Sequence, residues 1–177
     1  ISACLVGSEM CIRDRVYTRR EEFTSARVRH PMVMWAKTGV RKDGTLTAIQ
    51  LRVLSNAGAY GSHAMTVMNN TCAKALPLFR CENIKWIADA VYTNLIPGGA
   101  YRGYGVTQGI FPIGVMMDEM AETIGMDQVD FWKMNTIKKG ETSPIFKALS
   151  ETGKGVEMIV ESCSLPECID RGAEIFC

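Results

Sequence analysis

The sequence lacks the patterns of several common kinds of functional site. It contains two histidines, too few for a His-based metal site, and its seven cysteines form no C-x-x-C pair. Its net charge is only +1, and its basic residues form no stripe along the sequence, which argues against a nucleic-acid surface. No apolar run approaches the roughly 20 residues that span a bilayer. These absences favour a soluble, globular chain that contacts neither nucleic acid nor a membrane.

The cysteines are scattered along the chain and odd in number, so they do not suggest a disulfide framework. We expect them to be buried as small hydrophobic side chains in a reducing cytoplasm. They are Cys4, Cys11, Cys72, Cys81, Cys163, Cys168 and Cys177.

Two phosphate-binding motifs are also incomplete or missing. Gly103 and Gly105 occupy the first two positions of G-x-G-x-x-G, but Gln108 stands at the third. No G-x-x-x-x-G-K-[ST] loop occurs. The sequence therefore gives little support for a nucleotide site.

A glycine-rich run from Pro97 to Gly109 is the most distinctive stretch of the chain, with five glycines around two tyrosines and an arginine. Glycine allows backbone N–H groups to approach a ligand closely. A helix that starts after such a run offers further unpaired N–H donors. Arg102 adds a fork of donors, and the tyrosines add flat apolar faces. The run predicts a cradle for a planar, oxygenated ligand, and a plain strand-to-helix turn is the alternative.

Alternating apolar residues predict three strands. Met32–Val40 and Leu46–Asn56 are expected to pair as a β-hairpin through the Asp-Gly turn of Arg41–Gly44. Asn83–Thr93 is expected to be a buried strand that leads into the glycine-rich run.

Helical periodicity predicts several helices. Residues 62–75 carry Met65, Met68 and Cys72 as a core-facing stripe. A second helix is expected near Gln108, because Pro112 is tolerated only in a first turn.

This second helix would run to Ile124 and end at a Gly125 cap, and Asp127 would cap the next helix. A last helix is expected to begin after Ser164 and to reach Phe176. The whole pattern indicates an α+β fold of mixed strands, a β-hairpin and packed helices.

Gly99–Gln108 resembles the signature loop of the molybdenum hydroxylases, the xanthine dehydrogenase and aldehyde oxidase family. That loop reads alanine, aromatic, arginine, glycine, aromatic, glycine, two variable residues and glutamine. Similar segments occur in family order on both sides of it. They are Thr18–Phe23, Arg29–Pro31, Lys42–Leu46, Asn56–Tyr60, Asp118–Glu119, Gly125–Asp127 and Lys133–Asn135.

The resemblance implies that residues 15–177 are a partial molybdopterin-binding domain of the xanthine dehydrogenase type. Residues 1–14 resemble a translated sequencing adapter, and we expect them to be a non-native leader. The family's catalytic glutamate is expected beyond Cys177, so no catalytic residue is expected within the chain.

The resemblance also implies the roles of the loop residues. The main chain of Gly99, Ala100, Tyr101, Arg102 and Gly103 would bind the molybdenum–molybdopterin cofactor, with no side chain ligating the metal directly. The Arg102 side chain would also fix the loop.

Substrate binding is expected from two further residues. Tyr104 would stack on the substrate ring. Xanthine-specific members carry an arginine 32 positions before the loop arginine, and Asn70 stands there in this sequence. The loss of this charge argues against xanthine and leaves another purine, a nicotinate-like N-heteroaromatic or an aldehyde.

By resemblance the complete enzyme would be a cytoplasmic oxidoreductase in which a molybdenum-bound hydroxide attacks the substrate and hydride passes to sulfur. Its partners would be the remainder of the molybdenum subunit, a 2Fe-2S subunit and an FAD subunit. The chain alone is expected to be inactive. The alternatives are a non-catalytic glycine-loop module that binds an anion or a partner protein, and a reductase of the same family acting on an aromatic thioester.

Overall fold

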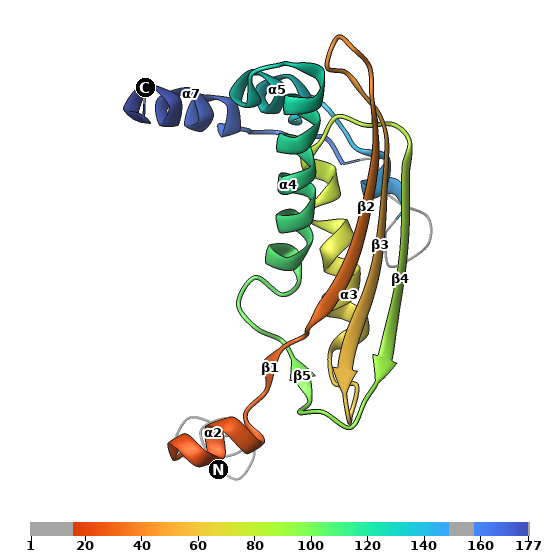
Figure 1. Cartoon of the computed structure of the whole chain (residues 1–177), viewed down its shortest axis with the longest axis vertical. Helices are drawn as coiled ribbons and strands as arrows, with labels where there is room; N and C mark the ends of the chain where they lie inside the picture. Colours follow the sequence, from red (N-terminus) through yellow and green to blue (C-terminus); the bar gives the residue numbers. More distant parts are fainter. Residues whose placement is uncertain (1–15, 149–157, 177) are drawn as a thin grey trace, which may run out of the picture.

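A three-stranded sheet with helices on one face forms the body of the protein (Figure 1), in a computed structural model that describes residues 16–148 and 158–176. The expected leader at residues 1–14 lies outside the described residues. The elements in chain order are α2 (Arg19–Ser25), β1 (Val28–Arg29), β2 (Met32–Val40), β3 (Leu46–Gly58), α3 (Ala64–Ala73), a 3-10 turn (Leu76–Leu78), β4 (Ile84–Tyr92), β5 (Gly98–Gly99), α4 (Val106–Ile124), α5 (Gln128–Asn135), α6 (Pro144–Ala148) and α7 (Leu165–Phe176). This mixture of helices and open sheets confirms the α+β prediction.

The predicted β-hairpin is confirmed, with β2 antiparallel to β3. Its turn is closed by a 2.9 Å hydrogen bond from the Gly44 N–H to the Arg41 carbonyl, and Gly44 adopts a left-handed φ of +88°. The Thr45 N–H donates to an Asp43 carboxylate oxygen at 2.9 Å, which lowers the pKa of Asp43. The Asp43-Gly44 pair thus forms the hairpin turn that its residue types predict.

The third strand lies where expected, but the prediction that it is buried was wrong. Strand β4 pairs in parallel with β3 and forms one edge of the order β2-β3-β4. Its side chains alternate between a half-buried inner row that includes Trp86 and an exposed outer row that includes Ile87. One sheet face is covered and the other is open, so an alternating pattern results instead of a continuous buried run.

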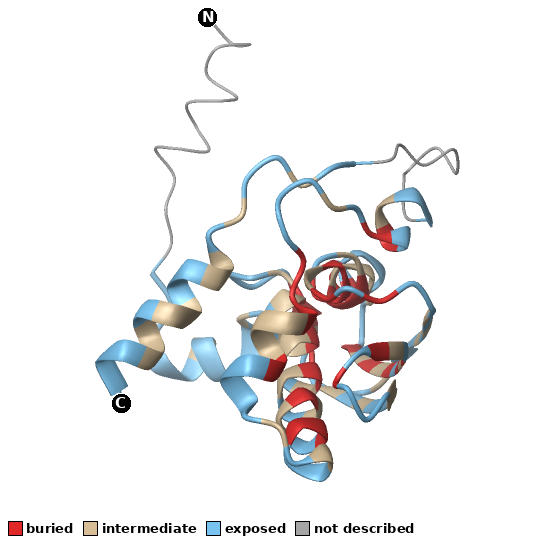
Figure 2. Ribbon diagram, turned by 90° about the horizontal axis from the view of Figure 1, so that it is seen from above, coloured by how far each residue is buried: buried red, intermediate tan, exposed pale blue. Residues whose placement is uncertain are grey.

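The core lies between the inner sheet face and helices α3 and α4, and α5 packs against the end of α4 (Figures 1 and 2). From the predicted stripe on α3, Met68 and Cys72 are buried, but Met65, the second residue of the helix, is 69% exposed. The largest fully buried side chains include Phe79, Phe131, Leu51, Leu76, Ile113 and Met117.

Helix α4 starts at Val106, slightly earlier than predicted, and Pro112 is its seventh residue. The prediction that Pro112 lies in the first turn of this helix was therefore wrong. Proline in the second turn removes one helical hydrogen bond, and this happens at a position where Pro112 is only half-buried. The predicted caps are confirmed: Gly125 ends α4 with φ +72°, and the Asp127 side chain accepts from the Asp130 N–H at 3.1 Å.

The outer face of the sheet exposes a patch of apolar side chains. Val33 is 54% exposed and Trp35 is 50% exposed, and Val91 continues the patch on β4. The Arg52 guanidinium lies 5.4 Å from the centre of the Trp35 ring, which covers part of that ring. In the described helices no segment is long and apolar enough to cross a membrane.

The prediction of buried cysteines holds for two of the four described ones. Cys72 and Cys81 are buried, Cys163 is half-buried, and Cys168 is exposed on α7. Cys168 departs from the prediction because α7 buries none of its residues in this chain (Figure 2).

This difference predicts selective alkylation. Burial raises the pKa of the Cys72 thiol from 9.0 to about 12, so at pH 8 its thiolate fraction is about a thousandfold below that of a free thiol. We expect iodoacetamide to modify Cys168 in the native protein and Cys72 only after denaturation, as read by peptide mass spectrometry. Between pH 9 and 12 the Cys72 thiol loses its proton in the unfolded state but keeps it in the folded state. The effect of Cys72 on the free energy of unfolding is therefore constant below pH 9, and the free energy of unfolding decreases as the pH rises from 9 to 12. Equal modification of both cysteines in the native state would contradict the buried position of Cys72.

Candidate functional site

The glycine-rich run is held in place by a short parallel pairing of β1 with β5. Both glycines of β5 are buried, and each is closely packed. A Cβ on Gly98 would overlap the His30 imidazole, and one on Gly99 would lie 2.7 Å from Arg27 Cδ. Only glycine leaves room for these neighbours, so the start of the loop is fixed against β1.

The loop then turns sharply through three consecutive left-handed residues. Gly103, Tyr104 and Gly105 have φ of +95°, +46° and +100°. Two hydrogen bonds close the turn, from the Tyr104 N–H to the Tyr101 carbonyl at 2.7 Å and from the Val106 N–H to the Gly103 carbonyl at 2.9 Å. A left-handed tyrosine is uncommon, and such conformations persist where surrounding contacts hold them.

Several backbone donors of the loop remain unpaired. Within the described residues, the N–H groups of Tyr101, Arg102 and Gly103 donate no hydrogen bond. Residues 100–103 are exposed, and the loop leads directly into the start of α4, a helix of 19 residues. The loop therefore offers donors to solvent at the positive end of a long helix.

Arg29 on β1 holds this loop from one side. Its Nη1 donates to Thr107 Oγ1 at 2.8 Å and to Gln108 Oε1 at 3.2 Å, and its Nη2 donates to the Arg102 carbonyl at 2.8 Å. Its guanidinium also lies 4.5 Å from the centre of the Tyr101 ring.

The expectation that the Arg102 side chain fixes the loop is corrected by these contacts. In the part of the chain that the structure describes, the Arg102 side chain makes no hydrogen bond or ion pair, and the Arg29 side chain takes that role. Gln108 does tie the loop to its surroundings, since its Nε2 donates to the His30 carbonyl at 3.4 Å. Sequence reasoning noted Arg29 only as part of a motif, because no local pattern signals a contact across 73 residues.

Tyr104 is half-buried and contacts the start of α3. Its hydroxyl lies 2.8 Å from His63 Nδ1, and the two rings meet edge to face with centres 6.0 Å apart. His63 was not identified from the sequence, where a histidine before a helix carries no distinctive signal.

Asn70 lies on α3, seven residues after His63, which is the N-cap of that helix. The spacing places Asn70 about 10 Å along the helix axis from His63. No hydrogen bond of the Asn70 side chain occurs within the described residues.

His30 is buried, with 1% of its surface exposed, and its Nδ1 lies 2.9 Å from the Asn56 carbonyl oxygen. This agrees with a structural role at the strand entrance. Among residues 16–148 and 158–176, no three His, Cys, Asp or Glu side chains converge as in a metal site.

A hollow of about 580 Å³ lies beside the start of α4, next to the Arg29 contacts. It is lined by Arg29, Met32, Met34, Thr107, Gln108, Phe111 and Pro112. Its lining residues come from β1, β2 and the first two turns of α4.

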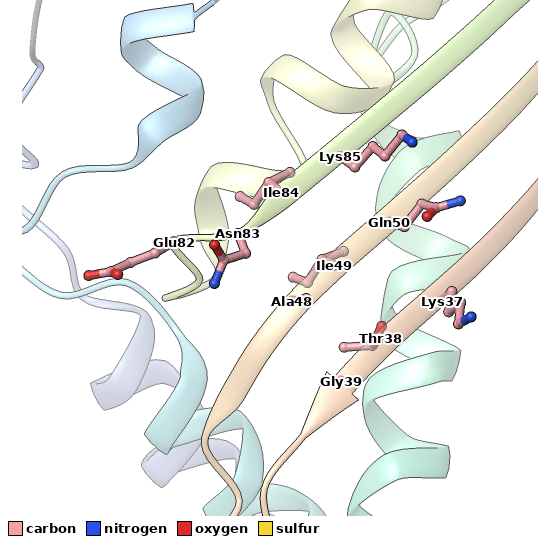
Figure 3. A pocket seen from close by; sticks show the side chains of 10 residues that line it. All are labelled: Lys37, Thr38, Gly39, Ala48, Ile49, Gln50, Glu82, Asn83, Ile84 and Lys85. Atoms are coloured by element: carbon pink, nitrogen blue, oxygen red, sulfur yellow. The ribbon is translucent and has the colours of Figure 1, made fainter.

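A second hollow lies at the hairpin end of the sheet, lined by residues that include Lys37, Gln50 and Lys85 (Figure 3). The glycine-rich loop meets the sheet near Gly58, at the other end of β3. At about 3.3 Å per strand residue, the distance between Gln50 and Gly58 is roughly 26 Å. This second hollow is therefore separate from the loop.

Known proteins resemble this chain over most of its length. The family model described as "Molybdopterin cofactor-binding domain" matches residues 13–136. The probable hypoxanthine oxidase XdhD of Escherichia coli (strain K12) is 36% identical over 176 residues, which are 98% of this chain and 18% of that protein. The nicotinate dehydrogenase large molybdopterin subunit of Eubacterium barkeri is 35% identical over 159 residues, 90% of this chain and 35% of that protein.

The solved aldehyde oxidoreductase from Desulfovibrio gigas has the same fold, with a TM-score of 0.75 and 29% identity. The match covers 90% of this chain and 16% of that one. The chain thus spans between 16% and 35% of the length of these relatives. The resemblance noted in the glycine-rich loop is confirmed, and this chain belongs to the molybdopterin cofactor-binding domain family.

Proposed function

We propose that residues 99–103 bind the molybdopterin cofactor through main-chain N–H groups, as one part of a larger molybdenum-dependent oxidoreductase. The observation that carries this proposal is the set of unpaired N–H donors on the exposed residues 101–103, in a loop that Arg29 ties to the start of α4. Such donors suit the oxygen ligands and ring heteroatoms of a metallopterin. The glycines suit it as well, because backbone without a Cβ admits a close ligand.

In this proposal the cofactor supplies the redox chemistry when bound, and the chain binds and orients. Tyr104 would offer its ring to the substrate, a contact worth about 0.5–1.5 kcal/mol beyond area burial. The bond between its hydroxyl and His63 limits rotation of the ring, so the aromatic face is held before a substrate arrives.

The proposed substrate is an N-heteroaromatic compound or an aldehyde, hydroxylated by the complete enzyme. The names of the relatives support this range, since they refer to hypoxanthine, nicotinate and aldehyde. Asn70 is retained as a proposed substrate-side residue. An uncharged amide there pairs more weakly with an anionic substrate than an arginine would.

The proposed partners are the rest of a molybdenum subunit, an iron–sulfur subunit and an FAD subunit, in the cytoplasm. The name of the relative from Eubacterium barkeri supports the first of these, because it describes a large molybdopterin subunit. The open apolar patch around Trp35 also favours a chain that packs against further polypeptide.

Gly103→Ala tests the loop as the cofactor site. Alanine is strained at φ +95°, and its Cβ would lie 2.8 Å from Thr107 Cγ2, so the loop must shift. We expect molybdopterin affinity to fall about tenfold, the equivalent of one charge-assisted hydrogen bond. The measurement is titration with the isolated cofactor, followed by its absorbance.

Gly140→Ala is the matched control, because Gly140 has φ +88° but no atom within 4 Å of an added Cβ, and it lies far along the chain. It carries a similar backbone strain and should leave cofactor affinity unchanged. Equal affinity in Gly103→Ala, Gly140→Ala and the parent protein would contradict the proposed site.

The rival function is an anion- or partner-binding module, which the same exposed donors would serve. Inorganic phosphate distinguishes the two. The measurement is a titration of the protein with phosphate up to millimolar concentration. If the affinity of the loop for phosphate equals its affinity for the pterin cofactor, the anion-binding module is favoured.

A further inference from the structure

We propose that Arg29 is a positioning residue that holds the glycine-rich loop in the orientation that presents its N–H groups to the cofactor. This inference rests on the proposed function of the loop. Arg29 belongs to β1 and precedes the loop by about 70 residues, and its guanidinium donates to the Arg102 carbonyl and to the side chains of Thr107 and Gln108.

The key contact is the 2.8 Å hydrogen bond from Arg29 Nη2 to the Arg102 carbonyl oxygen. In a trans peptide the carbonyl and the following N–H point in opposite directions. With the Arg102 carbonyl turned toward Arg29, the Gly103 N–H must point away from it. The Arg29 guanidinium on one side of this peptide thereby orients the Gly103 N–H toward the opposite side.

The other contacts of Arg29 keep the guanidinium in place. Thr107 Oγ1 and Gln108 Oε1 accept from Nη1, so the first turn of α4 anchors one arm while Nη2 holds the loop. The Tyr101 ring lies 4.5 Å from the guanidinium carbon and covers one of its faces. One side chain therefore links β1, the loop and α4.

A lysine cannot replace this geometry. The planar guanidinium serves three oxygen acceptors and a ring at once, whereas an ammonium is a compact point charge on a flexible stem. The Arg102 carbonyl would then be free to turn, because Gly103 imposes little restriction on the peptide.

The direct test is amide hydrogen exchange of Tyr104 and Val106 in the protein without cofactor, since their N–H groups close the turn. We expect Arg29→Gln to speed exchange at both by about tenfold or more, from the loss of charged hydrogen bonds. Arg29→Lys should restore only part of the protection. Arg52→Gln is the matched control, because it also removes a guanidinium from above an aromatic ring, on the far side of the sheet, and should leave both amides unchanged.

The second readout is titration with the isolated molybdopterin cofactor, where Arg29→Gln should weaken binding about tenfold and Arg52→Gln should not. Unchanged exchange in Arg29→Gln overturns the inference whatever the cofactor does. If Arg29→Gln exchanges faster but binds the cofactor as the parent does, the inference about Arg29 is also overturned. In that case the proposed function of the loop survives if Gly103→Ala still weakens cofactor binding. If neither Arg29→Gln nor Gly103→Ala affects binding, the proposed function itself fails.

Thr107→Val provides a second test of the inference if Arg29→Gln does not fold. It removes one acceptor of the guanidinium and leaves the bond to the Arg102 carbonyl possible. Exchange at Tyr104 and Val106 should then rise by a smaller factor, about two- to threefold. No change in Thr107→Val, with a circular dichroism spectrum like that of the parent, overturns the inference.

Discussion

Gly109→Ala is expected to destabilise the protein by about 3 kcal/mol, through a clash between two helices. Gly109 is buried on α4, and a Cβ there would overlap the Thr71 carbonyl oxygen of α3. That neighbour is backbone, so it cannot move aside as the end of a flexible side chain would. The helices must separate and lose contacts around Met68 and Ile113. The midpoint of urea unfolding, followed by circular dichroism, measures the effect.

The same helix offers a matched control in Gly114. Its added Cβ would find its nearest neighbours in the Trp132 ring, at 3.7 Å and beyond, an ordinary van der Waals contact. Because alanine favours a helix over glycine, Gly114→Ala is expected to stabilise the protein by about 0.5–1 kcal/mol. A similar loss of stability in both variants would show that the close approach of α3 and α4 is not the cause.

Asn135→Ala is expected to cost about 2–4 kcal/mol, because it leaves buried backbone groups without partners. The Asn135 side chain is 3% exposed and joins α5 to the β-hairpin. Its Nδ2 donates to the Gly44 carbonyl at 2.9 Å, and its Oδ1 accepts from the Leu46 N–H at 3.2 Å. Urea unfolding of the variant gives the loss of free energy.

Asn83→Ala serves as its control. Asn83 is exposed and makes a single side-chain hydrogen bond, 2.9 Å long, to the Thr47 carbonyl. Water can replace that bond, so the expected cost is about 0.5–1 kcal/mol. If the two asparagine variants lose equal stability, burial of the Asn135 network is not what makes it important.

The hairpin and the helix caps could be predicted from the sequence because their causes are local. The Asp43-Gly44 turn, the Gly125 cap and the Asp127 cap each depend on a few neighbouring residues. The loop was recognised for the same reason, since its glycines and aromatics are consecutive.

Predictions failed where distant segments decide the outcome. Strand β4 was expected to be buried because its pattern is apolar, but the helices cover only one face of the sheet, so the row of β4 side chains on the other face is exposed. Met65 belongs to the same apolar stripe of α3 as the buried Cys72, yet it lies in the first turn of the helix and is exposed. Burial of such residues depends on what packs against them, which periodicity alone does not state.

The sequence by itself determined the family, the α+β class and the position of the glycine-rich loop, because ordered motifs and turn chemistry are written in consecutive residues. Only the tertiary structure decided which groups hold that loop. The bond from Arg29 to the Arg102 carbonyl joins residues 73 positions apart, and the contact of Tyr104 with His63 joins residues 41 apart. Such pairs form only when β1, α3 and the loop meet in the folded chain, so no local pattern contains them.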